Sequence, residues 1–296
     1  MGIGKIVPKS IRAYIRRKIG IEQKISVDKM VSEIADRKKQ LDDCALTNQR
    51  FRGKVVVITG ATGSIGSELC KSFVAEGAKV VACGRSQAKL DALLAREGTN
   101  IFPACFDITK ESDIEQAFDA IIKEHGRIDV LVNCAGGSSR DDCPLLSEQR
   151  VDVIDEILNL NLRAPILCAR LAQKIMIKNG YGSIVNFSSL MGLRGKACYF
   201  EYGAAKAGIE GLTRALAVES GKYNINVNCV TPSYVPRMEI TYARAKTLQE
   251  SNYMGTIGAS CDISSAVLYL ASNEAHFITG QNLIVDGGRS LGLKGD

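Results

Sequence analysis

The sequence predicts an α/β fold in which a doubly wound, Rossmann-like parallel sheet of about seven strands carries helices on both faces. Short apolar runs rich in β-branched residues alternate with helical stretches from residue 54 onward, and this alternation is typical of βαβ units. The first run passes into a glycine-rich turn and then into a helical pattern, as the first unit of such a sheet does. The expected strands are residues 54–59, 79–83, 101–106, 130–133, 183–187, 226–230 and 282–285.

The first expected strand, residues 54–59, reads Lys-Val-Val-Val-Ile-Thr. An apolar run without alternation is typical of a strand that is buried on both faces. A helix is expected next, over about residues 67–76, before the second strand begins at Lys79. We therefore expect a catalytic Rossmann-like domain over residues 51–296, preceded by an extension over residues 1–50.

The turn after the first strand spans residues 59–66 and reads Thr-Gly-Ala-Thr-Gly-Ser-Ile-Gly. Glycines let the backbone turn tightly and approach a pyrophosphate, and the N-terminus of the following helix offers free N–H groups to that anion. A purely structural βα turn is the alternative. The expected cofactor contacts in this turn are Gly60, Thr62, Gly63, Ser64, Ile65 and Gly66.

The second expected strand ends in Cys83-Gly84-Arg85-Ser86. A site for NAD usually places an acid here for the ribose hydroxyls, whereas a nearby arginine accommodates the 2′-phosphate of NADP. Gly84 occupies the expected acidic position and Arg85 follows it, so NADP(H) is favoured over NAD(H). A solvated arginine at a helix start is the alternative interpretation.

Composition and charge exclude several classes of protein. The ten cysteines form no Cys-x-x-Cys pair, so we expect reduced thiols in a cytoplasmic protein. With only two histidines, His125 and His276, we expect no metal site and no histidine-based triad. Residues 1–24 hold seven basic residues and one acidic residue, and this local excess of six positive charges equals the net charge of +6 of the whole chain. The remainder is formally neutral and gives no charge argument for nucleic-acid binding.

The N-terminal extension, residues 1–50, is basic and is expected to be mainly helical. A helical pattern follows Pro8. One stripe of this pattern carries Ile11, Tyr14 and Ile15, and the arginines lie off the stripe. A basic amphipathic helix is typical of a membrane surface or a partner site, so peripheral membrane contact through residues 1–24 is one hypothesis. Packing on the catalytic body or on another subunit is the alternative. The stripe is too short and too charged to span a bilayer.

Tyr202 and Lys206 lie four residues apart, with Ser189 thirteen residues upstream. On a helix, positions i and i+4 share one face. A free tyrosine ionises near pH ~10, and a neighbouring cation is expected to lower that pKa. With a serine hydroxyl to hold a substrate oxygen, the trio suits proton transfer to a carbonyl or from a carbinol.

The motifs of this chain and their order resemble those of the short-chain dehydrogenase/reductase family. The resemblance is to the single-domain type of that family, here with an N-terminal extension. The likeness covers about residues 51–296. It rests on the glycine turn, the segment 133–136 (Asn-Cys-Ala-Gly), Ser189, and the Tyr202/Lys206 pair, together with Thr279-Gly-Gln and Asp286-Gly-Gly near the end.

The resemblance implies a role for each matching residue. Tyr202 would be the general acid or base, Lys206 would tune it and hold the nicotinamide ribose, and Ser189 would bond the substrate oxygen. Asn161 would anchor a water-linked proton path. The remaining implied cofactor contacts are Asp107, Ile108, Asn133, Ala135, Gly136, Pro232, Ser233 and Val235.

Some positions have rivals and others depart from the family pattern. Ser188 competes with Ser189, and Asn159 competes with Asn161, whereas Tyr199 is excluded because position 203 is glycine. The departures are Ser64 within the turn, Cys134 for a second asparagine, Ser233 for a glycine, and Arg237 where a threonine usually binds the carboxamide.

These observations predict an NAD(P)-dependent oxidoreductase that interconverts a ketone and a secondary alcohol on a small polar substrate. A loose likeness of the N-terminus to leaders of bacterial surface-polysaccharide enzymes favours a keto-sugar, free or nucleotide-linked, and a location at the inner face of the membrane. A 3-oxoacyl thioester is the alternative substrate, and a non-catalytic dinucleotide-binding scaffold is the alternative of another class. By resemblance, we also expect a homodimer or homotetramer. The expected substrate loops are residues 137–150 and 236–256, of which the second contains Arg237, Arg244 and Lys246.

Overall fold

The computed structural model describes residues 49–138, 144–237 and 240–292. A seven-stranded sheet runs through the middle of these residues in the order β3-β2-β1-β4-β5-β6-β7, and every neighbouring pair is parallel. The predicted doubly wound α/β fold is therefore confirmed. The strands are β1 (Val55–Thr59), β2 (Lys79–Gly84), β3 (Ile101–Cys105), β4 (Val130–Asn133), β5 (Gly182–Phe187), β6 (Ile225–Pro232) and β7 (Asn282–Val285).

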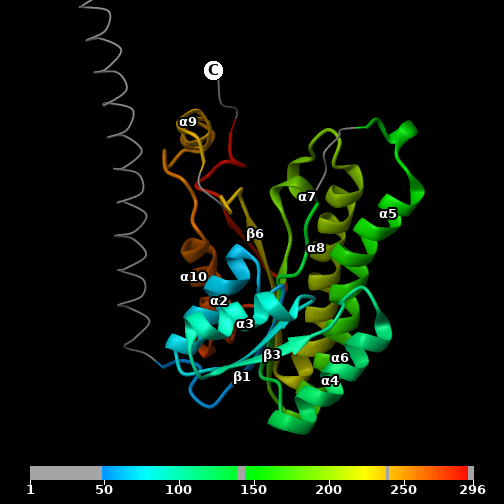
Figure 1. Ribbon diagram of the computed structural model, residues 1–296, viewed down its shortest axis with the longest axis vertical. Coiled ribbons are helices and arrows are strands. Elements are labelled where there is room, and N and C mark those ends of the chain that lie inside the picture. Colours follow the sequence, from blue (N-terminus) through cyan, green and yellow to red (C-terminus); the bar gives the residue numbers. More distant parts are fainter. Residues whose placement is uncertain (1–48, 139–143, 238–239, 293–296) are drawn as a thin grey trace, which may run out of the picture.

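Helices cover both faces of the sheet (Figure 1). One face is covered by α2 (Ser64–Ala75), α3 (Gln87–Glu97) and α10 (Ser260–Ala271), and the other by α4 (Glu111–His125), α6 (Ala164–Asn179) and α8 (Phe200–Ser220). The shorter helices are α5 (Val151–Leu158), α7 (Leu190–Arg194) and α9 (Tyr242–Glu250), with 3₁₀ turns at Leu146–Glu148, Gly221–Tyr223 and Asn273–Ala275.

Strand β1 shows why its apolar run does not alternate. Val56 and Ile58 pack into the core under α2 and α10, whereas Val55 and Val57 pack into the core under α4 and α6. All four side chains are at most 2% exposed. A strand covered on both sides needs apolar residues at every position, so the predicted burial is confirmed.

The strand order reverses between β1 and β4, where the chain leaves the β2/β3 half of the sheet for the β4–β7 half. Thr59 at the end of β1 pairs with Cys83 and with Asn133, and Asn133 pairs with Asn186 of β5. These strand ends lie at one level, and ligands of open α/β sheets bind in the crevice at such a reversal.

The predicted extension lies almost wholly outside the described residues. Of residues 1–50, only Gln49 and Arg50 are described, and the Arg50 guanidinium bonds the carboxylate of Glu76, which is fully buried. None of the helices that the structure describes is both long enough and apolar enough to cross a membrane.

Candidate active site

The glycine turn brings the start of α2 against the end of β1. Gly60 has a φ of +69°, and a Cβ there would lie 2.7 Å from the Cα of Ala135. A Cβ on Gly66 would lie 2.1 Å from the carbonyl oxygen of Gly60. Only glycine fits at either position, because the neighbouring atoms belong to the backbone.

Helix α2 begins at Ser64, three residues earlier than predicted, so Ser64, Ile65 and Gly66 form its first turn. No described side chain caps this turn, and it contains no acidic residue. Its free N–H groups and its dipole favour an anion. The turn therefore fits the pyrophosphate of a dinucleotide, as the sequence predicts.

The expected adenosine end of the site carries Arg85 and Asp107. A Cβ on Gly84 would meet Thr62 Cγ2 at 3.3 Å, so the usual acid would be crowded here. The Asp107 carboxylate accepts hydrogen bonds from Thr109 N at 3.0 Å and Thr109 Oγ1 at 2.7 Å. These bonds chiefly lower the Asp107 pKa, with smaller contributions from Lys110 and from Arg85. Arg85 is exposed on this side of the crevice.

Ile108, also an expected cofactor contact, packs against the core under α4. Asn133 likewise turns its side chain into the protein, where Nδ2 donates to Asn186 Oδ1 at 2.9 Å and to the Pro165 carbonyl at 3.3 Å. The Ala135 N–H donates to Thr59 Oγ1 at 3.1 Å. The floor of the crevice is thus formed by the backbone of the segment after β4.

Gly136 is packed between two expected catalytic side chains. A Cβ there would lie 2.7 Å from Asn161 Oδ1 and 3.2 Å from Lys206 Nζ. Asn161 is fully buried in a π-helical turn, Asn159–Arg163, between α5 and α6. Its amide pairs with Gly137 in both directions, each at 3.0 Å, and donates to the Ile157 carbonyl. Single π turns occur often at functional sites.

Ser189 caps α7 by accepting from Met191 N at 3.3 Å, and its hydroxyl lies near the Tyr202 hydroxyl. Lys206 is 4% exposed, and its Nζ donates to the Phe187 carbonyl at 2.9 Å and lies 5.7 Å from the centroid of the Tyr202 ring. The structure therefore brings Ser189, Tyr202, Lys206 and Asn161 together.

Burial changes the expected electrostatics of the pair. Burial raises the pKa of Tyr202, while the nearby Ser189 hydroxyl and Arg237 lower it in part. Burial also lowers the pKa of Lys206 to about 8. The expectation that Lys206 lowers the pKa of Tyr202 is not met in this arrangement, because desolvation opposes both charged forms and the ammonium is directed to Phe187.

The structure distinguishes the rival residues. The Ser188 hydroxyl bonds the Lys206 carbonyl at 2.9 Å and Glu210 Oε1 at 3.0 Å, so it serves α8 rather than the crevice. Asn159 Nδ2 donates to the Thr109 carbonyl at 3.1 Å, away from Gly136. These contacts favour Ser189 and Asn161, as predicted.

One positioning residue was missed from the sequence. A Cβ on Gly192 of α7 would lie 2.8 Å from Ala207 N and 2.9 Å from the Lys206 carbonyl carbon. Gly192 therefore lets α7 approach α8 closely enough for Ser189 to reach Tyr202. The signal in the sequence was a glycine on each of the two segments, but only the packing shows that Gly192 lies against Lys206 and Ala207 and that Gly203 lies against Met191.

The cysteines require a correction. Cys198, four residues before Tyr202, is disulfide-bonded and has a φ of +69°, so the expectation that all ten thiols are reduced is wrong for this residue. The free cysteines among the described residues are Cys70, Cys83, Cys105, Cys134, Cys168, Cys229 and Cys261. Spacing in the sequence gives no signal for such a bond. The described residues contain no cluster suited to a metal ion.

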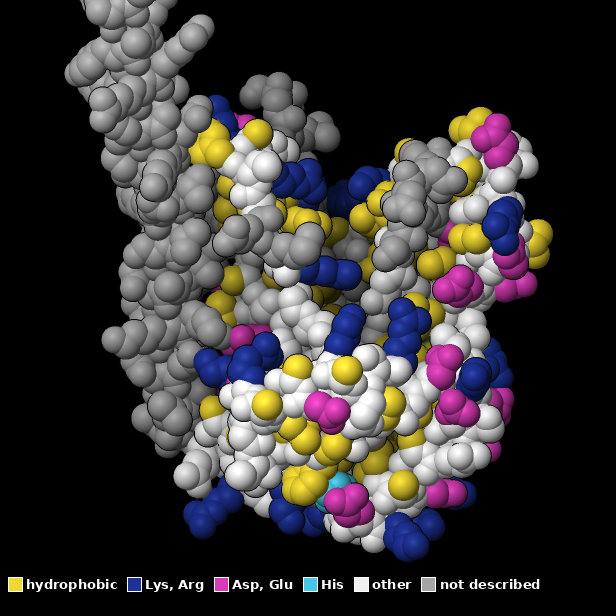
Figure 2. Space-filling model, viewed as in Figure 1, with side chains coloured by type: hydrophobic (Ala, Val, Ile, Leu, Met, Phe, Trp, Pro, Cys, Tyr) yellow, Lys and Arg dark blue, Asp and Glu magenta, His cyan; other side chains and the backbone are white. Residues whose placement is uncertain are grey.

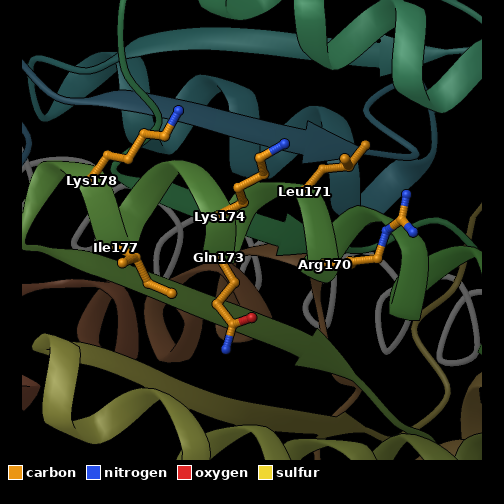
Figure 3. A pocket seen from close by; sticks show the side chains of 6 residues that line it. All are labelled: Arg170, Leu171, Gln173, Lys174, Ile177 and Lys178. Carbon is orange, nitrogen blue, oxygen red and sulfur yellow. The ribbon is translucent and has the colours of Figure 1, made fainter.

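A separate open hollow of about 620 Å³ lies along α6 and is lined by side chains of that helix (Figure 3). Lys174, Lys178 and Leu171 point to one side of the helix, and Gln173 and Ile177 point to the other. The lining consists of cationic, amide and aliphatic side chains without an acid, so the hollow offers no acid–base pair for proton transfer.

Titration of Lys206 gives a pH prediction. The unfolded chain keeps this proton up to the ordinary lysine value of 10.5, whereas the folded protein loses it at about 8. Between these values the folded state binds fewer protons, so its stability rises with pH. We expect wild type to gain about 1 kcal/mol of unfolding free energy by pH 9, relative to its value below pH 7.

Lys206→Met removes this titration and is expected to lack the gain. Urea unfolding of both proteins at pH 6.5, 8 and 9 measures it, and the difference between their slopes cancels the titration of other groups. Parallel slopes for the two proteins would contradict a depressed pKa at Lys206.

Comparison with known proteins agrees with this geometry. Residues 60–290 match the family model described as enoyl-(acyl carrier protein) reductase. The chain is 34% identical over 253 residues to a 7alpha-hydroxysteroid dehydrogenase of Bacteroides fragilis, covering 82% of this chain and 96% of that protein. It is 36% identical over 245 residues to a 3-oxoacyl-[acyl-carrier-protein] reductase of Thermotoga maritima, covering 81% and 98%.

An L-fucose dehydrogenase of Bos taurus is 32% identical over 252 residues, covering 82% of this chain and 92% of that protein. The fold, the site and these similarities define a class: the chain belongs to the short-chain dehydrogenase/reductase family. It is an oxidoreductase that acts on CH–OH groups with a nicotinamide dinucleotide.

Proposed function

We propose that the protein is an NADP(H)-preferring oxidoreductase that interconverts a ketone and a secondary alcohol on a small polar substrate. The observation that carries the proposal is the meeting of three side chains in one place: the Ser189 hydroxyl lies near the Tyr202 hydroxyl, and the buried Lys206 ammonium lies 5.7 Å from the centroid of the Tyr202 ring. A bound nicotinamide supplies or accepts the hydride. Ser189 holds the substrate oxygen, and Tyr202 donates its proton to that oxygen in reduction and removes it in oxidation.

The raised pKa of Tyr202 suits the reductive direction, because it keeps the phenol protonated and ready to donate at neutral pH. The Asn161 amide donates to the Gly137 carbonyl and accepts from the Gly137 N–H. Gly136 lies between this amide and the Lys206 ammonium. This arrangement supports a proton path through Lys206 to solvent. The complete set argues against a non-catalytic scaffold, whose best support is the unusual Ser233 and Arg237.

The substrate is proposed from the relatives and from the site. Similarity to an L-fucose dehydrogenase favours a keto-sugar, free or nucleotide-linked. Similarity to 3-oxoacyl-[acyl-carrier-protein] reductases favours a 3-oxoacyl thioester as the second candidate. NADPH oxidation at 340 nm against a panel of keto-sugars, nucleotide-linked keto-sugars and 3-oxoacyl thioesters separates them. No oxidation with any carbonyl would contradict the enzyme proposal.

Arg85 supports the preference for NADP(H), because no acid stands at position 84 and its guanidinium lies near Asp107. A charge-assisted hydrogen bond to the 2′-phosphate contributes about 1.5–3 kcal/mol. We therefore expect Arg85→Ala to weaken NADPH binding by roughly 10- to 150-fold, with NADH binding unchanged. Titration of NADPH fluorescence measures both affinities.

The matched control is Lys89→Ala, which removes an exposed cation from the same region of the structure, on α3. It is expected to leave both affinities unchanged. Equal losses for NADPH and NADH in Arg85→Ala would place Arg85 outside the 2′-phosphate site.

We also propose a homodimer or homotetramer at a cytoplasmic location, with residues 1–24 touching the inner membrane surface. The outer faces of α6 and α8 support assembly, because Ile166, Ile177 and Val218 are exposed there by 41%, 37% and 87%. Light scattering measures the oligomer. Pelleting with anionic liposomes at low and high salt measures membrane contact, since electrostatic attachment weakens with screening.

A further inference from the structure

The loop after β6 is anchored at Ser233 and at Val235. The Ser233 N–H donates to the Val285 carbonyl at 3.0 Å, and Val235 is 9% exposed in the core under α2 and α10. Arg237 follows two residues later and is exposed. These anchors place Arg237 near the carboxyl edge of the sheet, the same edge that carries Tyr202.

Arg237 lies near the reacting end of the crevice. Its charge lowers in part the pKa of the Tyr202 hydroxyl of α8 and of the Cys134 thiol after β4. One belongs to the segment after β4 and the other to the start of α8, so the charge of Arg237 is felt on both segments. Among the described residues, no carboxylate forms an ion pair with Arg237.

Neither neighbour balances this charge. Burial raises the pKa of Cys134 to about 12, and burial also raises the pKa of Tyr202, so both groups are neutral near pH 7. Lys and Arg side chains gather around the hollow above the sheet, between α9 and the α5/α7 side, with no acidic side chain visible inside it (Figure 2). The hollow is therefore electropositive and has room for an anion.

We propose that Arg237 is a specificity-determining residue that binds an anionic group of the substrate, a carboxylate or a phosphate monoester, close to the reacting carbonyl. The inference rests on the proposed function, because it assigns the substrate class of that same site. A guanidinium binds either group through paired N–H donors. A threonine at this position, which the family usually carries, has no charge to offer.

The anion belongs to the substrate rather than to the cofactor. The uncapped first turn of α2 fits the pyrophosphate, and Arg85 lies at the opposite, adenosine end. By resemblance to the family, the ring next to Tyr202 would be the nicotinamide, which is neutral when reduced and cationic when oxidised. A cation beside that ring would gain nothing from it, whereas an anion on the substrate would compensate both charges.

Matched pairs of carbonyl substrates test the proposal with the NADPH-loaded enzyme. Acetoacetate against methyl acetoacetate probes the carboxylate, and dihydroxyacetone phosphate against dihydroxyacetone probes the phosphate. We expect wild type to prefer the charged member of at least one pair, measured as kcat/KM. In Arg237→Thr that preference, taken as the ratio of kcat/KM for the charged member to kcat/KM for the neutral member, is expected to fall by about tenfold or more. The ratio cancels any effect that the loss of the charge has on both members through Tyr202.

Two variants serve as references. Arg237→Lys keeps the charge and is expected to retain part of the preference. Arg214→Thr makes the same change of charge on α8, twelve residues from Tyr202 or about 18 Å along the helix, where Arg214 is 63% exposed. It is expected to behave as wild type.

The outcomes separate the two proposals. Turnover of neutral carbonyls without any charge preference overturns the role of Arg237 and leaves the oxidoreductase proposal intact. A weaker NADPH affinity in Arg237→Thr assigns the residue to the cofactor and also overturns it. If no carbonyl is reduced, acetoacetate and dihydroxyacetone phosphate are titrated by calorimetry into the NADP⁺ complex. Binding that is abolished in Arg237→Thr supports the anion site. Absence of binding to the wild-type complex overturns it.

Discussion

Tyr202→Phe is expected to lower kcat by about 10²- to 10⁴-fold, the usual contribution of a positioned general acid or base. The ring keeps its packing on α8, and only the hydroxyl that lies near Ser189 is lost. NADPH affinity and the free energy of unfolding are therefore expected to stay near the wild-type values. Stopped-flow single turnover with NADPH measures the chemical step, and fluorescence titration measures binding.

Tyr199→Phe is the matched control, since Tyr199 precedes the same helix, and its ring lies 4.5 Å from Lys196 Nζ. It is expected to retain activity. Full activity in Tyr202→Phe would remove the phenol from proton transfer and return the scaffold alternative to consideration.

Gly66→Ala is expected to destabilise the protein by about 3 kcal/mol or more, because the new Cβ would lie 2.1 Å from the Gly60 carbonyl oxygen and 2.9 Å from Ala61 Cα. Neither is the end of a flexible side chain, so the turn itself must open. Loss of NADPH binding is expected to accompany the loss of stability, since both depend on the same backbone. Chemical denaturation and NADPH titration measure the two effects.

Gly63→Ala separates folding from binding at the same turn. Its Cβ would lie 3.4 Å from the Gly60 carbonyl oxygen, an ordinary contact, and Gly63 has a φ of −79°. Gly63→Ala is expected to fold normally and to weaken NADPH binding, because its methyl group stands where a pyrophosphate approaches. Wild-type stability in Gly66→Ala would show that the turn is looser than its geometry indicates.

Local sequence patterns predicted most of the elements. Uninterrupted apolar runs identify buried strands because both faces of a parallel sheet are covered, and all seven expected strands are present. The boundaries were less certain: α2 begins at Ser64 rather than near residue 67, because the helix starts inside the glycine turn. Four-residue spacing on one helix placed Tyr202 and Lys206 correctly, since that geometry is local.

Interactions between distant segments could not be predicted from the sequence. Ser188 and Ser189 are neighbours, and only the approach of α7 to α8 shows which hydroxyl reaches Tyr202. The direction of the Tyr202 pKa was misjudged from the Lys206 spacing, because burial by many distant atoms outweighs one nearby cation. The Cys198 disulfide likewise had no signal in the sequence, because the spacing of cysteines does not say which thiols the fold brings together.

The sequence by itself determined the fold class, and it indicated the glycine turn and the candidate proton-transfer residues, because these follow from periodicity and spacing along one strand or helix. The tertiary structure alone decided the order of the strands, the burial of Asn161 beside Gly136 rather than of Asn159, and the approach of α7 to α8. Those features depend on side chains that are far apart in the chain and meet only when the sheet and its helices have packed.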